Sequence, residues 1–236
     1  AVGSYLDARS ADGRWLVRID DVDTPRAVPG AGEGILRTLE SLGFEWDGPV
    51  VWQHQRTEAY EAALAQLREA GRVFGCACTR KMLADAPRTA DGAVRYPGTC
   101  RDGLPPGRSA RAWRFRVPEA VVRFEDRIQG TIEEDLPADV GDFVLKRADG
   151  LFAYQLATVV DDAEAGVTDV VRGIDLMLST PRQIAVQQAL GLPTPRYAHL
   201  PVVVDAHGQK LSKQSLARAV DGFAPAQLIF DALICL

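Results

Sequence analysis

The stretch Trp15-Leu16-Val17-Arg18-Ile19-Asp20-Asp21-Val22-Asp23 decides the fold. Its first five residues predict a short apolar strand, and three aspartates follow at the carboxyl end of that strand. In open α/β sheets, ligands bind beyond the carboxyl ends of the parallel strands. The three acids therefore indicate either a binding site or only the polar end of a strand, and this stretch alone leaves both interpretations open.

The segments on either side of this stretch predict further strands and helices. They are a helix over 1–9, a helix over 35–42, a strand over 50–52, a helix over 57–71 with Thr57 as N-cap, a sheet pattern over 151–160, a strand over 167–171, a helix from Thr180 as N-cap to Gly191, and a strand over 197–204. Strand and helix in alternation are the signature of a parallel sheet. We therefore expect an α/β fold.

Composition fits a globular protein of 236 residues, of which 47% are apolar and 25% charged. The net charge of −5 means that any contact with nucleic acid must come from a local basic patch. No apolar run approaches the roughly 20 residues that span a bilayer, and the first residues do not resemble a signal peptide. We therefore expect a cytoplasmic protein without membrane contact.

Residues 76–148 interrupt the sheet pattern with a segment rich in glycine, proline and arginine. Three of the four cysteines, Cys76, Cys78 and Cys100, lie in this segment within a span of 25 positions. In a chain without a signal peptide, clustered cysteines favour a metal site over disulfides. We interpret the segment as an insertion between two halves of the sheet domain, and we expect the fourth cysteine, Cys235, to be a buried apolar residue.

A lysine-rich loop, Lys210-Leu211-Ser212-Lys213-Gln214, follows the last predicted strand. Two compact positive charges on such a loop suit a phosphate group that gains negative charge during a reaction. The same residues also fit a solvated basic turn. The loop alone does not decide between these two interpretations.

Five segments, in this order along the chain, resemble the catalytic half of the class I glutamyl-type aminoacyl-tRNA synthetases. They are Arg18–Arg26, Phe152–Tyr154, Val159–Asp162, Val171–Asp175 and the Lys210 loop, which stands in the place of the family's KMSKS motif. Five matches in order are far more specific than any one of them. The resemblance implies a Rossmann-like parallel sheet with a zinc-containing insertion.

The resemblance also implies how the chain divides into domains. Residues 1–75 and 149–195 would form the two parts of the catalytic domain, with its first strand missing. Residues 76–148 would form the zinc-binding, acceptor-type insertion. Residues 196–236 would hold the KMSKS-type loop and the start of a helical region.

The reaction that the resemblance implies is the activation of L-glutamate by ATP, with Mg²⁺ bound to the ATP, to give glutamyl-adenylate. Two features are similar to a short branch of the family that lacks the anticodon-binding domain: the pattern Cys-x-Cys followed by Tyr-x-x-x-Cys, and Gln214 in place of arginine. Members of that branch activate glutamate without tRNA and transfer it to the queuosine base of tRNA(Asp). We therefore expect a monomeric ligase with ATP, L-glutamate and this tRNA as partners.

The resemblance assigns roles to individual side chains. Lys213 would contact the phosphates of ATP, and Lys210 would assist it. Arg172, Tyr154 and Asp20 would bind glutamate, since its carboxylates need cationic or hydroxyl donors and its ammonium needs an acid. Asp20 stands where relatives commonly carry glutamate and reaches one methylene less. Without the resemblance, Arg172 would read as a surface arginine and Tyr154 as a core aromatic residue.

The resemblance further implies a zinc site formed by Cys76, Cys78, Tyr96 and Cys100. Structural zinc prefers four ligands in a closed tetrahedron. Tyrosine is an unusual ligand because its phenol, with a pKa near 10, must lose its proton, and a bound dication can lower that pKa. The alternative interpretation is a group of reduced cysteines beside a core tyrosine.

A local basic patch lies in the insertion and is opposed only by Asp102. It consists of Arg101, Arg108, Arg111, Arg114 and Arg116. Such a patch can meet the phosphates of a tRNA stem. It fits a solvated, loop-rich surface equally well.

The family's other signature, the HIGH motif, is not in this sequence, because none of His54, His199 and His207 lies in a His-x-Gly-His pattern. In relatives that motif lies just before the position of residue 1. We therefore expect a chain truncated at its N-terminus, which as it stands binds ATP poorly, and inactivity of the truncated chain is one outcome that stays open. Two other functions stay open: the catalytic fragment of an ordinary glutamyl-tRNA synthetase, and a non-catalytic tRNA- or nucleotide-binding paralogue.

Overall fold

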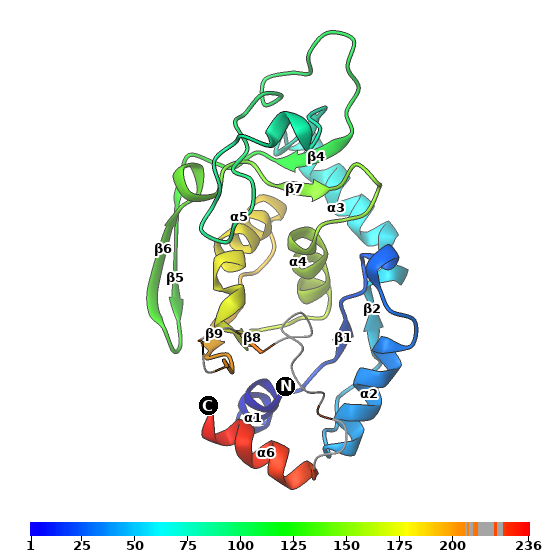
Figure 1. The fold of residues 1–236 in the computed structure, drawn as a ribbon, viewed down its shortest axis with the longest axis vertical. Helices are drawn as coiled ribbons and strands as arrows, with labels where there is room; N and C mark the ends of the chain where they lie inside the picture. The colour runs from blue at the N-terminus through cyan, green and yellow to red at the C-terminus, as the bar shows by residue number, and fades with distance from the viewer. Residues whose placement is uncertain (206, 208–209, 212–219, 221–223) are drawn as a thin grey trace.

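The computed structural model describes residues 1–205, 207, 210–211, 220 and 224–236 (Figure 1). Its α-helices are α1 (Val2–Ser10), α2 (Ala31–Ser41), α3 (Thr57–Glu69), α4 (Tyr154–Glu164), α5 (Thr180–Leu190) and α6 (Pro225–Ile234). Its strands are β1 (Arg18–Ile19), β2 (Val51–Trp52), β3 (Val73–Cys76), β4 (Ala112–Phe115), β5 (Val121–Asp126), β6 (Gly130–Asp135), β7 (Val144–Lys146), β8 (Asp169–Gly173) and β9 (Arg196–Leu200). Five short helical turns complete the structure: η1 (Thr24–Arg26), η2 (Gln53–Gln55), η3 (Lys81–Leu83), η4 (Leu136–Val140) and η5 (Ile174–Ser179).

The predicted parallel strands are present, but they belong to separate sheets. β1 pairs with β2 in parallel, and β8 pairs with β9 in parallel within a four-stranded sheet of order β6-β5-β9-β8. Among the described residues, no hydrogen-bonded ladder joins β1 to β8. Figure 1 shows α4 and α5 side by side between the β1–β2 pair and the β5–β6 hairpin. The two parallel pairs are thus held in one body by helix packing rather than by a continuous sheet.

The main core forms where α3, α4 and α5 pack against buried side chains of β5 and β9. Tyr60 and Leu67 of α3, Leu156 and Val159 of α4, and Val186 of α5 are at most 1% exposed. Spacings of three and seven residues place such side chains on one face of each helix. This core fixes the start of α4 and of α5, which carry candidate site residues.

Residues 156–160 do not continue the sheet, as the sequence pattern predicted, but lie inside α4. An uninterrupted apolar run is compatible with either a buried strand or a buried helix, because periodicity does not distinguish the two. Here Leu156, Ala157, Thr158 and Val159 are all buried, so the helix is surrounded by protein at this level. That burial explains why the run lacks the polar face by which a helix is recognised.

Neither predicted N-cap residue caps its helix. Thr57 and Thr180 are the first residues of α3 and α5, and the positions before them, Arg56 and Ser179, make no side-chain cap hydrogen bond. The predicted end of α5 is confirmed, since Gly191 adopts a left-handed conformation with φ of 68°. The hydroxyl of Thr180 serves the site instead, as described below.

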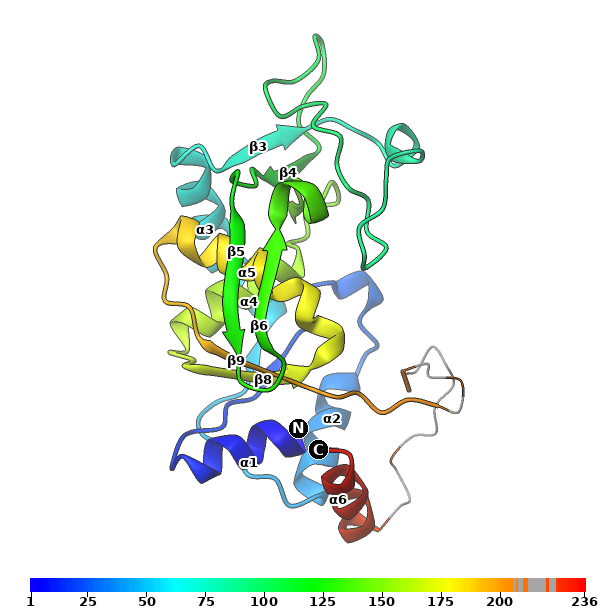
Figure 2. The ribbon, with the colours of Figure 1, turned by 90° about the vertical axis from the view of Figure 1, so that its left-hand side faces the viewer.

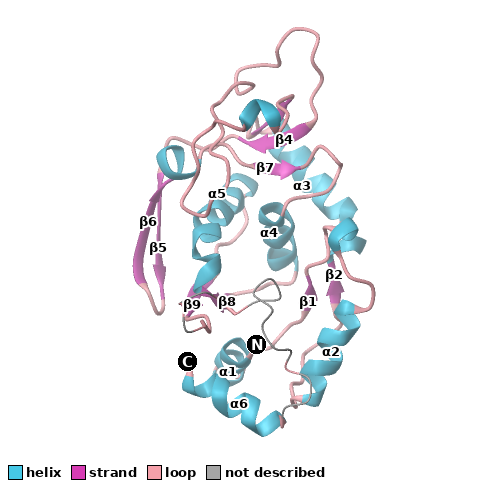
Figure 3. Cartoon of the chain, viewed as in Figure 1, coloured by secondary structure: helices cyan, strands magenta, loops and turns pink. Residues whose placement is uncertain are grey.

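A third sheet, of order β3-β4-β7, lies at the end of the molecule opposite α1 and α6 (Figure 2). Between β3 and β4, residues 77–111 contain the turn η3 and an isolated β-bridge between Arg88 and Val94, and Figure 3 shows most of this segment as loop. Within the insertion, Ala112–Phe115 form β4. A loop of this length has few backbone hydrogen bonds to fix its conformation. We expect a metal bound at its cysteine cluster to stabilise it.

Helices α1 and α6 pack against each other and close the other end of the molecule (Figures 1 and 2). Cys235, expected to be buried, follows α6 and is exposed. None of the helices in the described part of the chain is long and apolar enough to cross a membrane.

Candidate active site and metal centre

Asp162, on α4, lies at the centre of a charged cluster beyond β1. Arg18 forms an ion pair with Asp162 and donates from Nε to Oδ1 of Asp20 at 2.7 Å. Burial raises the pKa of the Asp162 carboxyl, an effect that the charges of Arg18 and Arg172 oppose and that of Asp20 reinforces. The charges of the predicted site residues Asp20 and Arg172 thus act on one carboxylate with opposite effects on its pKa.

Arg172, on β8, is held in place by two neutral partners. Its Nε donates to Nε2 of His199 at 3.2 Å, and a terminal nitrogen donates to Oγ1 of Thr180 at 2.7 Å. His199 is 0% exposed, and its Nδ1 lies 2.6 Å from Oδ2 of the buried Asp126. Because Nε2 accepts from arginine, we assign the imidazole proton to Nδ1. Burial lowers the pKa of His199, in keeping with a neutral ring.

Tyr154, the first residue of α4, reaches the same region. The buried phenol of Tyr197 lies within the electrostatic influence of Arg172, Asp162 and Tyr154, and burial raises its pKa. Arg172 also lies over the Tyr197 ring, with its central carbon 5.6 Å from the centroid. Each of the three side chains predicted to bind glutamate is therefore close enough to Asp162 or Tyr197 to influence its charge.

This arrangement combines one oriented guanidinium with two carboxylates and a phenol. A guanidinium binds a carboxylate ligand through paired hydrogen bonds, while carboxylates bind an ammonium group. The site therefore has the charges that a zwitterionic amino acid needs. Arg18 occupies one oxygen of Asp20, whose side chain is 43% exposed.

The other acids that follow β1 have structural partners. The Asp21 carboxylate accepts from the backbone N–H of His54 at 2.9 Å and lies 2.5 Å from its Nδ1. Asp23 accepts from Arg147 at 2.6 Å and pairs with Arg26. The acidic stretch therefore divides into one residue at the candidate site and two that hold neighbouring segments.

Four residues of the site were not predicted from the sequence: Arg18, Asp162, Thr180 and His199. Arg18 and Asp162 lie inside segments that carry the family resemblance. The resemblance therefore pointed to their segments but did not assign a role to either residue. His199 gave a signal, since a histidine inside an apolar strand needs a polar partner when buried. That partner, Asp126, is 73 positions away, and no local pattern connects them.

Lys210 lies at the base of the lysine loop and forms an ion pair with Asp175. Asp175 follows β8 by two residues, so the base of the loop is tied to the strand that carries Arg172. Lys213, Ser212 and Gln214 lie outside the described residues.

Cys76, Cys78, Cys100 and Tyr96 bring four candidate ligand atoms together. The three sulfurs lie within 4.8 Å of one another, with Cys78 and Cys100 at 3.8 Å, and the Tyr96 oxygen lies 3.4 and 3.5 Å from the sulfurs of Cys76 and Cys78. A tetrahedral zinc with bonds of about 2.3 Å to sulfur and 2.0 Å to oxygen separates two sulfurs by about 3.8 Å and sulfur from oxygen by about 3.5 Å. The spacing of these atoms therefore fits zinc.

The surroundings of Tyr96 also fit a metal ligand. Burial raises the pKa of its phenol, so a nearby cation is needed before it can lose its proton. The guanidinium of Arg114 lies over the Tyr96 ring, 3.9 Å from the centroid, and the backbone N–H of Cys100 donates to the phenol oxygen at 2.8 Å. Both contacts favour negative charge on that oxygen.

We expect the protein to contain about one zinc per chain and Cys100→Ser to lose most of it, with a Tm lower by about 5 to 10 °C, because a structural zinc contributes to folding. Elemental analysis and a thermal melt measure these two quantities. Cys235→Ser is the matched control, since Cys235 is exposed and remote in sequence, and it should change neither quantity. A metal-free protein that melts like the wild type would contradict the zinc site.

Most of the predicted basic patch holds the insertion together. Arg101 pairs with the buried Asp142 and donates to the carbonyl of Val117, and Arg114 donates to the carbonyl of Asp142 at 3.0 Å. Arg116 donates to the carbonyl of Arg101 at 2.5 Å. Of the five arginines, Arg108 and Arg111 are exposed. These contacts leave fewer guanidinium groups for phosphates than the sequence suggested.

Comparison with known proteins identifies the family of the chain. Residues 1–224 match the family model of the catalytic domain of class I tRNA synthetases (E and Q). The glutamyl-Q tRNA(Asp) synthetase of Aromatoleum aromaticum is 62% identical over 233 residues, which cover 99% of this chain and 74% of that protein. That of Chromobacterium violaceum is 58% identical over 234 residues, covering 99% and 78%.

Solved structures support the same assignment. A glutamate tRNA ligase from Elizabethkingia meningosepticum, crystallised with its amino acid, is 27% identical and superposes with a TM-score of 0.77. The match covers 90% of this chain and 48% of the ligase, so the chain spans about half the length of that enzyme. The chain therefore belongs to the class I tRNA synthetases of the E and Q type, a family of ligases, and within it to the glutamyl-Q tRNA(Asp) synthetases.

Proposed function

We propose that this protein activates L-glutamate with ATP, without requiring tRNA, and transfers the glutamyl group to the queuosine base of tRNA(Asp). A carboxylate oxygen of glutamate attacks the α-phosphorus of ATP, the bond to the β-phosphate breaks, and pyrophosphate leaves. The glutamyl group then passes from the adenylate to the tRNA, and AMP is released. Mg²⁺ bound to ATP would neutralise charge on its phosphates.

The observation that carries this proposal is the fixed orientation of Arg172 by His199 and Thr180 beside the Asp162 carboxylate. We assign Arg172 to a carboxylate of glutamate and Tyr154 to a hydrogen bond with the substrate. Asp20 would contact the ammonium with the oxygen that Arg18 does not occupy. The relatives are named glutamyl-Q tRNA(Asp) synthetases, which supports glutamate and tRNA(Asp) as substrates.

The remaining parts of the proposal concern ATP, zinc and the organisation of the chain. Lys213, with Lys210, would contact phosphate oxygens as they gain charge, which is where fixed cations stabilise a transition state. Cys76, Cys78, Tyr96 and Cys100 would hold a structural zinc. Residues 1–75 and 149–195 would form the catalytic domain, 76–148 the insertion, and 196–236 the lysine loop and a helical region of a cytoplasmic monomer.

ATP–pyrophosphate exchange with glutamate, measured on the whole protein with and without tRNA, tests the proposal. Exchange without tRNA is expected. Exchange only with tRNA would instead support an ordinary glutamyl-tRNA synthetase, to whose fold the chain is similar. Absence of exchange, with retained tRNA binding, would support a non-catalytic binding protein.

Lys213→Ala is expected to lower the rate of pyrophosphate exchange about tenfold or more, because it removes a cation from the phosphates in the transition state. Initial rates at saturating glutamate measure the effect. Lys81→Ala, which removes an exposed lysine from η3 in the insertion, is the matched control and should leave the rate unchanged. Equal rates for the two variants would remove the phosphate role of Lys213.

A further inference from the structure

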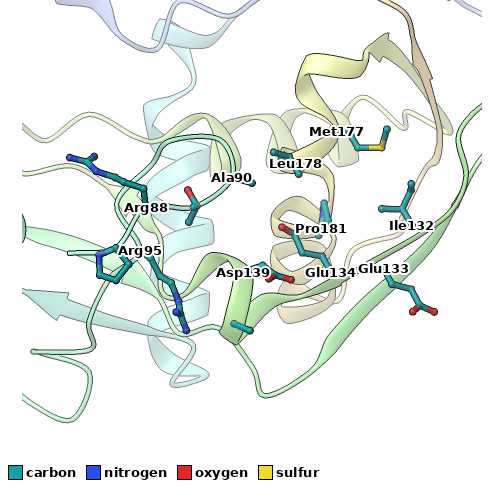
Figure 4. Close-up of a pocket in the computed structure, with 13 residues that line it drawn as sticks. Arg88, Ala90, Arg95, Ile132, Glu133, Glu134, Asp139, Met177, Leu178 and Pro181 are labelled. Carbon is teal, nitrogen blue, oxygen red and sulfur yellow. The ribbon is translucent and has the colours of Figure 1, made fainter. Parts of the chain in front are cut away.

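A pocket lies between the loop of residues 87–95, strand β6 and the start of α5 (Figure 4). Its volume is about 410 Å³, within the range of small-ligand sites. Ile132, Met177, Leu178 and Pro181 form an apolar wall. The pocket is therefore large enough for one ring system and offers it apolar side chains to pack against.

Glu134 places a carboxylate in this pocket. Along β6, Glu133 is exposed while Glu134 is partly buried, and Figure 4 shows Glu134 directed toward Pro181 and Glu133 directed away. Oε2 of Glu134 is buried, and no group in the described part of the chain donates a hydrogen bond to it. Burial raises the pKa of this carboxyl, and the positive charge of Arg182 opposes that shift. The carboxylate therefore lacks a donor that a ligand can supply.

A charge that points inward from an edge strand can also prevent that strand from pairing with another chain. That role, however, is fulfilled by any charged side chain and does not require an oxygen kept away from water. Arg182, whose positive charge acts on Glu134, donates from a terminal nitrogen to Asp91 at 2.5 Å and makes no hydrogen bond to Glu134. The unsatisfied oxygen thus points to a ligand rather than to edge protection alone.

The chemistry of the pocket selects among flat ligands. A guanine-type base presents two adjacent donors, N1–H and the N2 amine, which can meet both oxygens of one carboxylate. Adenine and cytosine present one amine beside an acceptor nitrogen, which would face a carboxylate oxygen. Among the bases, the guanine type is therefore the best match to Glu134.

Two arginines line the pocket, together with the acids Glu133 and Asp139. Arg88 is exposed beside the pocket, and Arg95, partly buried, donates to the carbonyl of Pro137 at 3.1 Å. Cations next to a base pocket suit the phosphates of a nucleic acid backbone. Proteins read single-stranded RNA loops by taking bases out of the stack and bonding to their edges. The pocket has a carboxylate that can bond to the edge of a base, and arginines that can contact the backbone phosphates.

We propose that this pocket binds a guanine-type base from a single-stranded loop of the tRNA, with Glu134 accepting from N1–H and the N2 amine. The inference rests on the proposed function, which makes tRNA a substrate. The base is either queuosine itself, whose ring carries the same two donors, or a guanosine near it in the loop.

The position of the pocket agrees with this role. Pro181 lines the pocket, and the residue before it, Thr180, accepts the hydrogen bond that orients Arg172. The pocket and the candidate glutamate site therefore share the first turn of α5. A base held in the pocket would bring its loop next to the activated amino acid.

The test is the affinity of the whole protein for the RNA stem–loop that carries queuosine, measured by fluorescence anisotropy. Each guanosine of the loop is replaced in turn by inosine, which lacks the N2 amine, and guanosine and inosine are also compared at the modified position. One inosine is expected to weaken binding to the wild type about tenfold. Glu134→Gln is expected to weaken binding of the parent RNA to a similar extent and to abolish the inosine penalty.

Glu133→Gln is the matched control, because Glu133 is the next residue on the same strand, is exposed, and pairs with Arg123 at 3.2 Å. It should keep both the affinity and the inosine penalty of the wild type. Equal affinities for the two variants, or an inosine penalty that survives in Glu134→Gln, would overturn the proposal. A penalty at the modified position identifies queuosine as the occupant, and a penalty elsewhere identifies a neighbouring guanosine.

Pyrophosphate exchange without tRNA, measured on the same wild-type preparation, separates this inference from the proposed function. Absence of exchange would refute the proposed activation of glutamate. The inosine measurements, in contrast, bear only on the pocket.

Discussion

Arg172→Ala is expected to lower kcat/KM for glutamate about a hundredfold or more in pyrophosphate exchange, since truncating one partner of a desolvated charge pair costs about 2 to 5 kcal/mol. Arg172 is the cation that we assign to a carboxylate of glutamate, and its removal also takes a compensating charge away from Asp162. Initial rates over a range of glutamate concentrations measure the effect.

Arg172→Lys distinguishes charge from geometry. Lysine keeps the charge but cannot bond His199 and Thr180 while presenting a planar pair of donors to a carboxylate, so only a small part of the activity should return. Arg196→Ala is the matched control, because Arg196 lies on the neighbouring strand β9 with a side chain that is 71% exposed. If Arg172→Ala behaved like Arg196→Ala, the assignment of the glutamate site would be wrong.

His199→Gln tests whether His199 positions Arg172. The variant should raise the KM for glutamate several-fold with little change in kcat, since Arg172 stays present but loses one of the two groups that orient it. A purely structural role for His199 would lower the amount of folded protein and leave KM unchanged.

The sequence predicted the local parts of this structure well. The cysteine cluster is one such part, because a metal-type site depends on short spacings that can be read along the chain. The parallel pairs β1–β2 and β8–β9 are another, because their strands are short apolar runs that end in polar residues. In both cases the residues that predict the structure lie within a few tens of positions of one another along the chain.

The parts that could not be predicted depend on contacts between distant segments. The support of Arg172 involves His199, and behind it Asp126, which share no spacing rule with β8. Residues 156–160 were assigned to a sheet because a helix buried on all sides has no polar face. The structure of the lysine loop at Lys213 lies outside the described residues, so its role stays a prediction.

Asp161→Ala is expected to lower the free energy of unfolding by about 3 to 5 kcal/mol, the cost of breaking a buried ion pair. The side chain of Asp161 is 2% exposed and accepts from Nε2 of Gln53 at 2.9 Å, Nε of Arg56 at 2.8 Å and the hydroxyl of Tyr60 at 2.8 Å. These partners come from η2 and α3, and Arg18 of β1 lies 3.9 Å from the same carboxylate. Urea unfolding followed by circular dichroism measures the change.

Glu164→Ala is the matched control for this change, because Glu164 lies one turn further along α4 and pairs with the same Arg56 at the surface. Its loss should cost at most about 1 kcal/mol, as for other exposed ion pairs. Asp161→Asn should fall between the two, since it keeps the volume but presents an amide where a carboxylate oxygen accepted hydrogen bonds. If Asp161→Ala were no more destabilising than Glu164→Ala, helix packing alone would hold β1 against α4. The position of Arg18 and Asp162 at the site would then depend on the apolar core and not on this buried carboxylate.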